Sequence, residues 1–210
     1  FRAMMRLDRV EVTGGFFLLL AWLNYLDRSL LVPMALTACA AHELGHIAII
    51  RLLGGKIKLI HLTAVGAELV LDSPMNYWQE GAAALAGPGV NLLLALGCCG
   101  FQRGLTFAGL NLALALFNLL PVGRLDGGRA LHCTLSLLAG PELADRIRAH
   151  LDRLCTVGML IIGLLLILER GNITLMMVAL WLLAASGRAK LPNFFSGRNN
   201  TCQQRKKKVQ

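Results

Sequence analysis

Long apolar runs separated by short polar segments dominate the hydrophobic pattern of this chain. Residues 30–50 contain one acidic residue and two histidines in 21 positions, while residues 81–100 and 104–123 carry no charged side chain. An α-helix needs about 20 apolar residues to cross the hydrocarbon layer of a bilayer. A soluble domain of this length could scarcely bury three such helices, so the pattern predicts an integral membrane protein.

Six segments are candidate membrane spans, of which the first, fifth and sixth are short. They are Val10–Leu26, Leu30–Ile50, Gly81–Gly100, Gly104–Leu120, Leu154–Leu168 and Ile173–Gly187. The expected fold class is therefore an all-α polytopic membrane protein with about six transmembrane helices.

Two polar segments between the spans have patterns of their own. Residues 56–63 alternate apolar and polar side chains, residues 67–72 do so partly, and glycines flank both stretches. This period of two predicts two or three short strands, which form a small β segment on the cytosolic face. Residues 141–148 open with Pro and Glu and predict an amphipathic helix on the same face.

The basic side chains indicate how the chain is oriented in the membrane. The net charge is +9, with 21 Lys and Arg residues. If the N-terminus lies inside, all of these except Arg28, Arg103 and Arg170 fall on the inner side. That asymmetry follows the positive-inside rule, so the excess charge needs no nucleic acid to explain it. We expect a multi-pass protein of the cell membrane with both termini cytosolic.

Composition agrees with this assignment. Hydrophobic residues make up 56% of the chain and the mean hydropathy is +0.60, above the 45–50% apolar share of a typical soluble domain. The six cysteines form no Cys-x-x-Cys pair and no disulfide framework. We predict one membrane-embedded domain over residues 1–187 and a basic cytosolic tail over 188–210, whose lysines can contact anionic lipid headgroups.

The second apolar run contains a motif with specific chemistry, His42-Glu43-Leu44-Gly45-His46. On a helix, histidines four residues apart lie on one face and can bind one zinc ion together. Glu43 can accept the proton of an attacking water. Two histidines and a carboxylate inside a membrane span are costly unless they have a function or a partner.

A catalytic zinc site needs a third protein ligand. Asp126 is the best candidate, because it follows an apolar span and precedes Gly127 and Gly128, which allow close backbone approach. His61 and His132 are competing candidates, whereas His150 is expected to be solvated.

These motifs resemble the site-2 protease family of intramembrane zinc metalloproteases. The resemblance rests on His42–His46, on Leu125-Asp126-Gly127-Gly128, on residues 86–91 (Ala-Gly-Pro-Gly-Val-Asn) and on residues 118–121 (Asn-Leu-Leu-Pro). The six-span layout, with short strands after the first motif and no PDZ insertion, is most similar to the branch of the stage IV sporulation protease, which processes a pro-sigma factor. The chain departs from that branch in ending in a short basic tail instead of a CBS domain.

The resemblance implies a zinc metalloendopeptidase that binds one zinc ion through His42, His46 and Asp126. Glu43 would be the catalytic base, and Asn91 and Asn118 would contact the substrate or its developing oxyanion. The implied substrate is a membrane-associated or transmembrane protein cut in regulated intramembrane proteolysis, as in sporulation. The lipid bilayer and a regulatory membrane protein are the other expected partners.

Alternative functions are left open at this point. A membrane protease of the class that processes prenylated proteins normally takes a glutamate as third ligand, and no suitable Glu follows the motif in a span. A metal transporter should carry polar residues along several spans, whereas here they cluster at one place. A catalytically inactive zinc-binding scaffold would keep the pocket and tolerate loss of Glu43.

Overall fold

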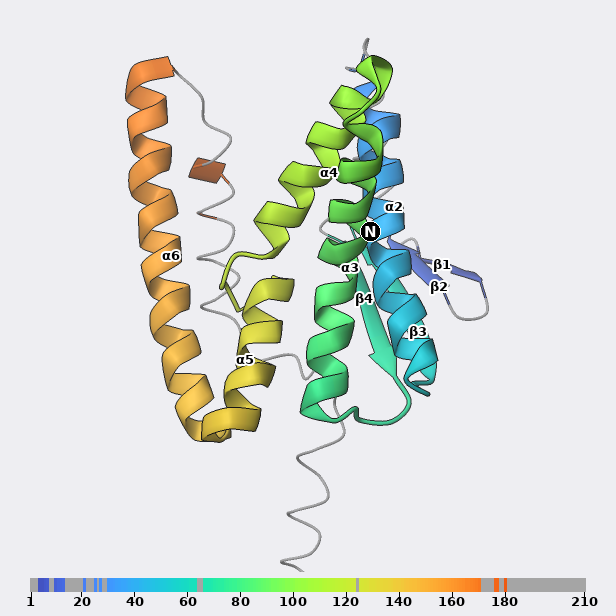
Figure 1. Cartoon of the computed structure of the whole chain (residues 1–210), viewed down its shortest axis with the longest axis vertical. Helices are drawn as coiled ribbons and strands as arrows, with labels where there is room; N and C mark the ends of the chain where they lie inside the picture. The colour runs from blue at the N-terminus through green and yellow to red at the C-terminus, as the bar shows by residue number, and fades with distance from the viewer. Residues whose placement is uncertain are drawn as a thin grey trace, which may run out of the picture.

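The computed structural model describes residues 4–7, 10–13, 30–63, 66–123 and 125–170, with a few isolated positions besides. Within these ranges five helices are defined: α2 (Leu31–Leu52), α3 (Tyr77–Cys98), α4 (Leu105–Asn118), α5 (Asp126–Ala139) and α6 (Pro141–Arg170). A single 3-10 turn, η1 (Gln102–Gly104), joins α3 to α4. Helix α3 is central, because it packs against α2, α4 and α5, while α6 contacts α5 at one side of the molecule (Figure 1).

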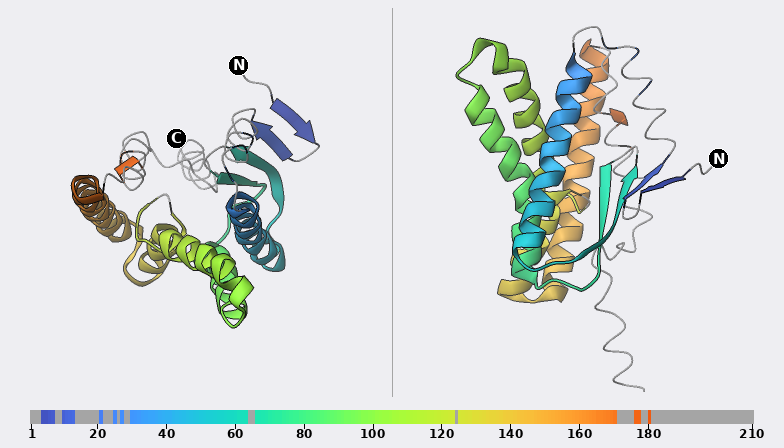
Figure 2. Two further views of the ribbon diagram at one scale, coloured as in Figure 1. Left: turned by 90° about the horizontal axis from the view of Figure 1, so that it is seen from above. Right: turned by 90° about the vertical axis from the view of Figure 1, so that its right-hand side faces the viewer.

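Four strands form one sheet on the side of the bundle opposite α6 (Figure 2). They are β1 (Met4–Leu7), β2 (Val10–Thr13), β3 (Ile57–Thr63) and β4 (Gly66–Leu71), in the spatial order β1-β2-β3-β4. The pairs β1–β2 and β3–β4 are antiparallel, and β2–β3 is parallel with Val10 opposite Ile60. A buried cluster of Ile50, Leu69, Met75 and Ala83 packs the C-terminal part of α2 and the start of α3 against the sheet.

Local sequence explains where the helices begin and end. Asp27 accepts a hydrogen bond from the backbone N–H of Val32 at 2.8 Å, in the first turn of α2. Gly54, with φ of 80°, follows the end of the same helix. Asn76 and Gln79 form a capping box at the start of α3. Gly140, with φ of 88°, ends α5, and the next residue, Pro141, opens α6.

Among the described residues, three helices are long and apolar enough to cross a membrane. These are Leu31–Leu52, Tyr77–Cys98 and Pro141–Glu169, and Leu105–Asn118 is a shorter apolar helix. Large apolar side chains face outward on them: Leu93 and Leu96 of α3 are each 71% exposed and Leu168 of α6 is 74% exposed. In water such a surface would be unfavourable, whereas in a bilayer it contacts lipid. The membrane assignment is therefore supported.

The prediction of six spans is only partly reproduced. The second and third spans correspond to α2 and α3. The fourth corresponds to α4, which has 14 residues and is shorter than predicted. Residues 154–168 are the C-terminal half of α6, continuous with the predicted amphipathic helix over 141–148, so those two elements are one helix. The sixth span, residues 173–187, lies almost entirely outside the described residues.

The first predicted span was wrong at its start. Residues 10–13 form strand β2 and are paired with both β1 and β3. The sequence Val-Glu-Val-Thr alternates apolar and polar side chains, which is a strand pattern that the search for long apolar runs overlooked. Of the two or three short strands predicted after α2, the structure shows two, β3 and β4, and the N-terminal strands extend that sheet. The fold is thus mostly helical with a small four-stranded sheet.

Candidate metal centre

The two histidines of the motif lie on the face of α2 that packs against α3. His42 and His46 are 5% and 7% exposed. Gly45 lies on the same buried face, and a Cβ there would come within 2.8 Å of the Ala86 carbonyl oxygen of α3. Small residues at this crossing let the two helices approach closely, which buries both imidazoles between them.

Asp126 reaches the same place from the start of α5. Its Oδ2 lies 3.0 Å from Nε2 of His42 and 3.3 Å from Nε2 of His46, although 84 positions separate Asp126 from His42. Close backbone packing makes this possible: a Cβ on Gly127 would collide with the Leu119 carbonyl, and one on Gly128 with that of Val122. The two glycines after Asp126 therefore bring the first turn of α5 against the segment that follows α4.

The outer nitrogen of each imidazole is paired within the protein. Nδ1 of His42 lies 2.6 Å from Oδ1 of Asn91, and Nδ1 of His46 lies 2.7 Å from the Ala83 carbonyl oxygen. A carbonyl oxygen accepts only, so Nδ1 is the donor in both bonds. In the neutral imidazole, Nε2 then presents a lone pair, as a metal ligand requires.

The three inward atoms are suited to a cation. The two Nε2 atoms are 3.1 Å apart, and both lie within 3.3 Å of Oδ2 of Asp126. Three lone-pair donors this close repel one another unless a positive charge lies between them. Zinc at 2.0–2.1 Å from tetrahedral ligands separates those ligands by about 3.3 Å. The predicted set of His42, His46 and Asp126 can therefore hold a metal ion, and its chemistry fits zinc.

Glu43 and Arg129 adjoin this group. Glu43 follows His42 on α2 and is partly buried, unlike the next residue, Leu44, which is 61% exposed. The guanidinium of Arg129 lies 3.5 Å from Oδ1 of Asp126, the carboxylate oxygen turned away from the histidines. Arg129 thus leaves Oδ2 directed toward the two imidazoles.

The two predicted substrate-contacting amides differ in position. Asn91 is fully buried on α3, and its amide nitrogen lies within hydrogen-bond distance of the Ala38 carbonyl and of Oδ1 of Asn111. Asn118, the last residue of α4, is partly buried and donates to the Leu114 carbonyl at 3.0 Å. The substrate roles of Asn91 and Asn118 stay predictions, and both N–H groups of Asn91 are already used inside the protein.

Asn111 was not selected in the sequence analysis. It is fully buried, next to Asn91. The sequence does contain a signal for Asn111, because an amide in the middle of an uncharged apolar run is unfavourable in a membrane unless it has a hydrogen-bond partner.

The competing histidines are not part of the cluster, as far as the structure describes them. His132 lies 3.2 Å from a carboxylate oxygen of Asp145 and packs edge-on against Tyr77. His150 is exposed and donates to the Arg146 carbonyl, as expected of a solvated residue. The side chain of His61 lies outside the described residues.

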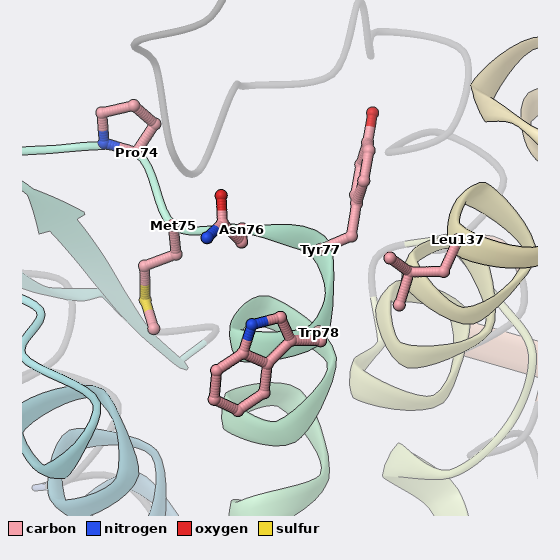
Figure 3. A pocket seen from close by; sticks show the side chains of 6 residues that line it. All are labelled: Pro74, Met75, Asn76, Tyr77, Trp78 and Leu137. Atoms are coloured by element: carbon pink, nitrogen blue, oxygen red, sulfur yellow. The ribbon is translucent and has the colours of Figure 1, made fainter.

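A separate hollow of about 470 Å³ lies at the start of α3 (Figure 3). It is lined by Pro74, Met75, Asn76, Tyr77, Trp78 and Leu137. Trp78 is 53% exposed and Leu137 56% exposed. The lining is largely apolar and contains none of the histidine and carboxylate groups described above, so we assign it no chemistry.

The fold and the cluster together define a class: a helical membrane protein with a buried His-His-Asp metal site between its helices. No profile of a known protein family matches the chain. A candidate zinc metalloprotease of Synechocystis sp. is 33% identical in an alignment of 195 positions that covers 84% of this chain and 49% of that protein. A zinc metalloprotease of Methanocaldococcus jannaschii is 29% identical in an alignment of 169 positions that covers 75% of this chain and 48% of that protein. The chain spans about half the length of the curated relatives it matches.

The chain is also similar in fold to a solved structure. A site-2 protease from Methanocaldococcus jannaschii matches 89% of this chain and 93% of its own, with a TM-score of 0.65 and 26% sequence identity. The relatives and this structure together support the site-2 protease family of zinc metalloproteases for this chain.

Proposed function

We propose that this chain is an intramembrane zinc metalloendopeptidase that hydrolyses peptide bonds of membrane-associated or transmembrane proteins. The observation that carries the proposal is the convergence of His42, His46 and Asp126 on one point between membrane helices, with Glu43 beside it. The names of the matched proteins support the same activity.

Each side chain at the site has a separate role in this proposal. Zinc bound by His42, His46 and Asp126 would supply a Lewis acid that polarises the scissile carbonyl and lowers the pKa of water. Glu43 accepts a proton from the attacking water and returns it to the leaving amine. The buried helix faces around the site exclude bulk water, which strengthens each of these electrostatic interactions. In this proposal Asn118, at the end of α4, contacts the substrate chain.

The site lies toward one end of α2. His46 is six residues from the helix end at Leu52, or about 9 Å along the axis. With the predicted orientation this end is cytosolic, so water and substrate would enter from the cytosol and the cut would fall near that face. A regulatory membrane protein that covers this entrance would control access.

A narrower proposal concerns the substrate. The short strands β3 and β4 directly after α2, with no inserted domain between α2 and α3, are consistent with the sporulation branch that processes a pro-sigma factor. Co-expression with a tagged pro-sigma factor tests this. Cleavage of other membrane substrates but not of this one would contradict the narrower proposal alone.

A reconstituted assay tests the main proposal. We expect detergent-purified protein to contain about one zinc per chain, by analogy with single-site catalytic zinc, and to cut a panel of membrane-inserted substrates. His46→Ala removes one ligand, so both zinc content and cleavage should fall together. A His46→Ala variant with full metal content would exclude this ligand set, and a zinc-loaded wild type that cuts no substrate would exclude the protease activity.

The orientation is tested by labelling single cysteines in a cysteine-free background. Exposed Ser73, before α3, and exposed Glu142, in the first turn of α6, lie on the proposed cytosolic side, whereas exposed Gln102 in η1 lies at the opposite end of α3. In intact cells an impermeant maleimide should label Gln102→Cys and leave Ser73→Cys and Glu142→Cys unmodified until the membrane is opened. The reverse labelling pattern would place the site on the other face.

A further inference from the structure

Helix α4 supplies no candidate metal ligand, yet it carries a buried amide beside the metal cluster. Asn111 is 0% exposed and is flanked by apolar residues along α4. Burying an amide in this environment is unfavourable unless each of its polar atoms finds a partner. The partners of Asn111 connect it to His42 through a second amide, and each step of that connection has a defined donor.

The first step fixes the orientation of Asn111. Its side chain lies 2.9 Å from the Phe107 carbonyl oxygen, one helical turn earlier. Because that oxygen only accepts, the NH₂ group of Asn111 must face it, and the side-chain oxygen of Asn111 must face the other way. That oxygen lies 2.7 Å from the side chain of Asn91.

The second step fixes the orientation of Asn91. Two acceptors surround one end of its amide: Oδ1 of Asn111 and the Ala38 carbonyl oxygen, the latter at 3.1 Å. Only an NH₂ group can satisfy both at once. A rotated Asn91 would place its oxygen against two other oxygens. The Asn91 oxygen is therefore the end that faces His42.

The third step determines which nitrogen of His42 carries the proton. Nδ1 lies 2.6 Å from the Asn91 oxygen and must donate to it, which leaves Nε2 as the lone-pair nitrogen facing Asp126. His46 reaches the same state by a shorter route, since its Nδ1 donates directly to the backbone carbonyl of Ala83. One ligand is thus oriented by backbone and the other by two side-chain amides in series.

We propose that Asn111 is a positioning residue for the metal centre: through Asn91 it holds His42 in the tautomer and ring orientation that direct Nε2 toward the metal. The inference rests on the proposed function only in taking this cluster to bind zinc. It makes α4 part of the metal centre, although the helix donates no ligand.

The test measures metal binding without proteolysis. Asn111→Leu keeps the number of side-chain heavy atoms and the branch at Cγ, but the acceptor for Asn91 is lost, so Asn91 can rotate and His42 loses its fixed tautomer. Zinc affinity, measured by competition with a chelator on purified protein, should fall by a factor of about 10, at the low end of the range for outer-shell partners. The visible absorption bands of the cobalt-substituted protein should shift as well, because they report ligand geometry.

Two variants separate positioning from packing. A buried carboxylic acid in Asn111→Asp can donate its O–H to Phe107 and accept from Asn91, so its zinc affinity should stay within about twofold of wild type. Asn118→Leu removes an amide of the same helix with the same type of bond to the carbonyl four residues earlier. Its zinc affinity should be unchanged.

The outcomes distinguish this inference from the protease proposal. Wild-type zinc affinity and cobalt bands in Asn111→Leu, or weaker binding in Asn111→Asp than in Asn111→Leu, would overturn it and leave the protease proposal standing. A wild-type protein that binds zinc but cuts no substrate would contradict the protease proposal and leave this inference standing. If Asn111→Leu does not fold, Asn111→Ala is measured instead and is held to the same expectation.

Discussion

Replacing Glu43 with glutamine should lower the rate of substrate cleavage by a factor of about 100 or more, the range expected when a general base is removed. Glutamine keeps the size and hydrogen-bonding capacity of the side chain but cannot accept the proton of the attacking water. The zinc content should stay unchanged, because the three ligand atoms belong to His42, His46 and Asp126 and none belongs to Glu43. Initial rates with a membrane-inserted substrate, together with metal analysis of the same sample, measure both quantities.

Glu142→Gln is the matched control for this experiment. Glu142 is an exposed residue in the first turn of α6, so the same substitution there should leave cleavage at the wild-type rate. Near-normal cleavage by Glu43→Gln would refute the proposed mechanism. Zinc binding without cleavage in the wild type would favour the scaffold alternative.

A single methyl group on Gly87 should weaken metal binding. A Cβ at this position of α3 would contact Nε2 of His46 and would lie 2.8 Å from Nε2 of His42, the two atoms that face the metal position. Gly87→Ala should therefore weaken zinc binding by at least about tenfold, the low end of the loss seen when groups that orient metal ligands are mutated, and cleavage should fall with it. Helix propensity predicts the opposite direction, since Ala stabilises a helix by up to about 1 kcal/mol relative to Gly.

Gly89→Ala tests the same substitution two residues further along α3. Apart from its chain neighbours and the nearby backbone of its own helix, no atom lies within 4 Å of a Cβ at Gly89, so this variant should keep its zinc and its activity. Wild-type zinc affinity in Gly87→Ala would show that the metal, if bound, lies elsewhere. Chelator competition on the two purified variants gives the comparison directly.

Much of the candidate site could be predicted from sequence because its central part is local. The spacing of His42 and His46 places both on one helical face whatever surrounds them. Asp126 is 84 positions away from His42, and it was selected from its place after an apolar span and beside two glycines, with which the motif resemblance agrees. Its approach depends on Gly127 and Gly128 packing against carbonyls of Leu119 and Val122, which no sequence pattern specifies.

Other features depended on tertiary context and were missed. The role of Asn111 arises from which helix faces it, and a single helix sequence does not contain that information. The strand over residues 10–13 pairs with residues 60–62, beyond the reach of a local search for apolar runs. The amphipathic helix over 141–148 and the fifth span were predicted as separate elements, yet α6 runs through both because no proline after Pro141 interrupts it.

The short length of α4 has a consequence for the membrane itself. A helix of 14 residues extends about 21 Å, whereas the hydrocarbon layer is about 30 Å thick. Leu105, Leu112 and Leu116 of α4 are 52%, 45% and 57% exposed, so one side of this helix is open to lipid tails, while the side with Asn111 packs against α3. Hydrophobic mismatch of this kind is relieved by local thinning of the bilayer, at a cost of fractions of a kcal/mol per Å. Headgroups and water would then descend beside α4, which shortens the path that a polar peptide segment has to travel to reach Asp126 and the two histidines.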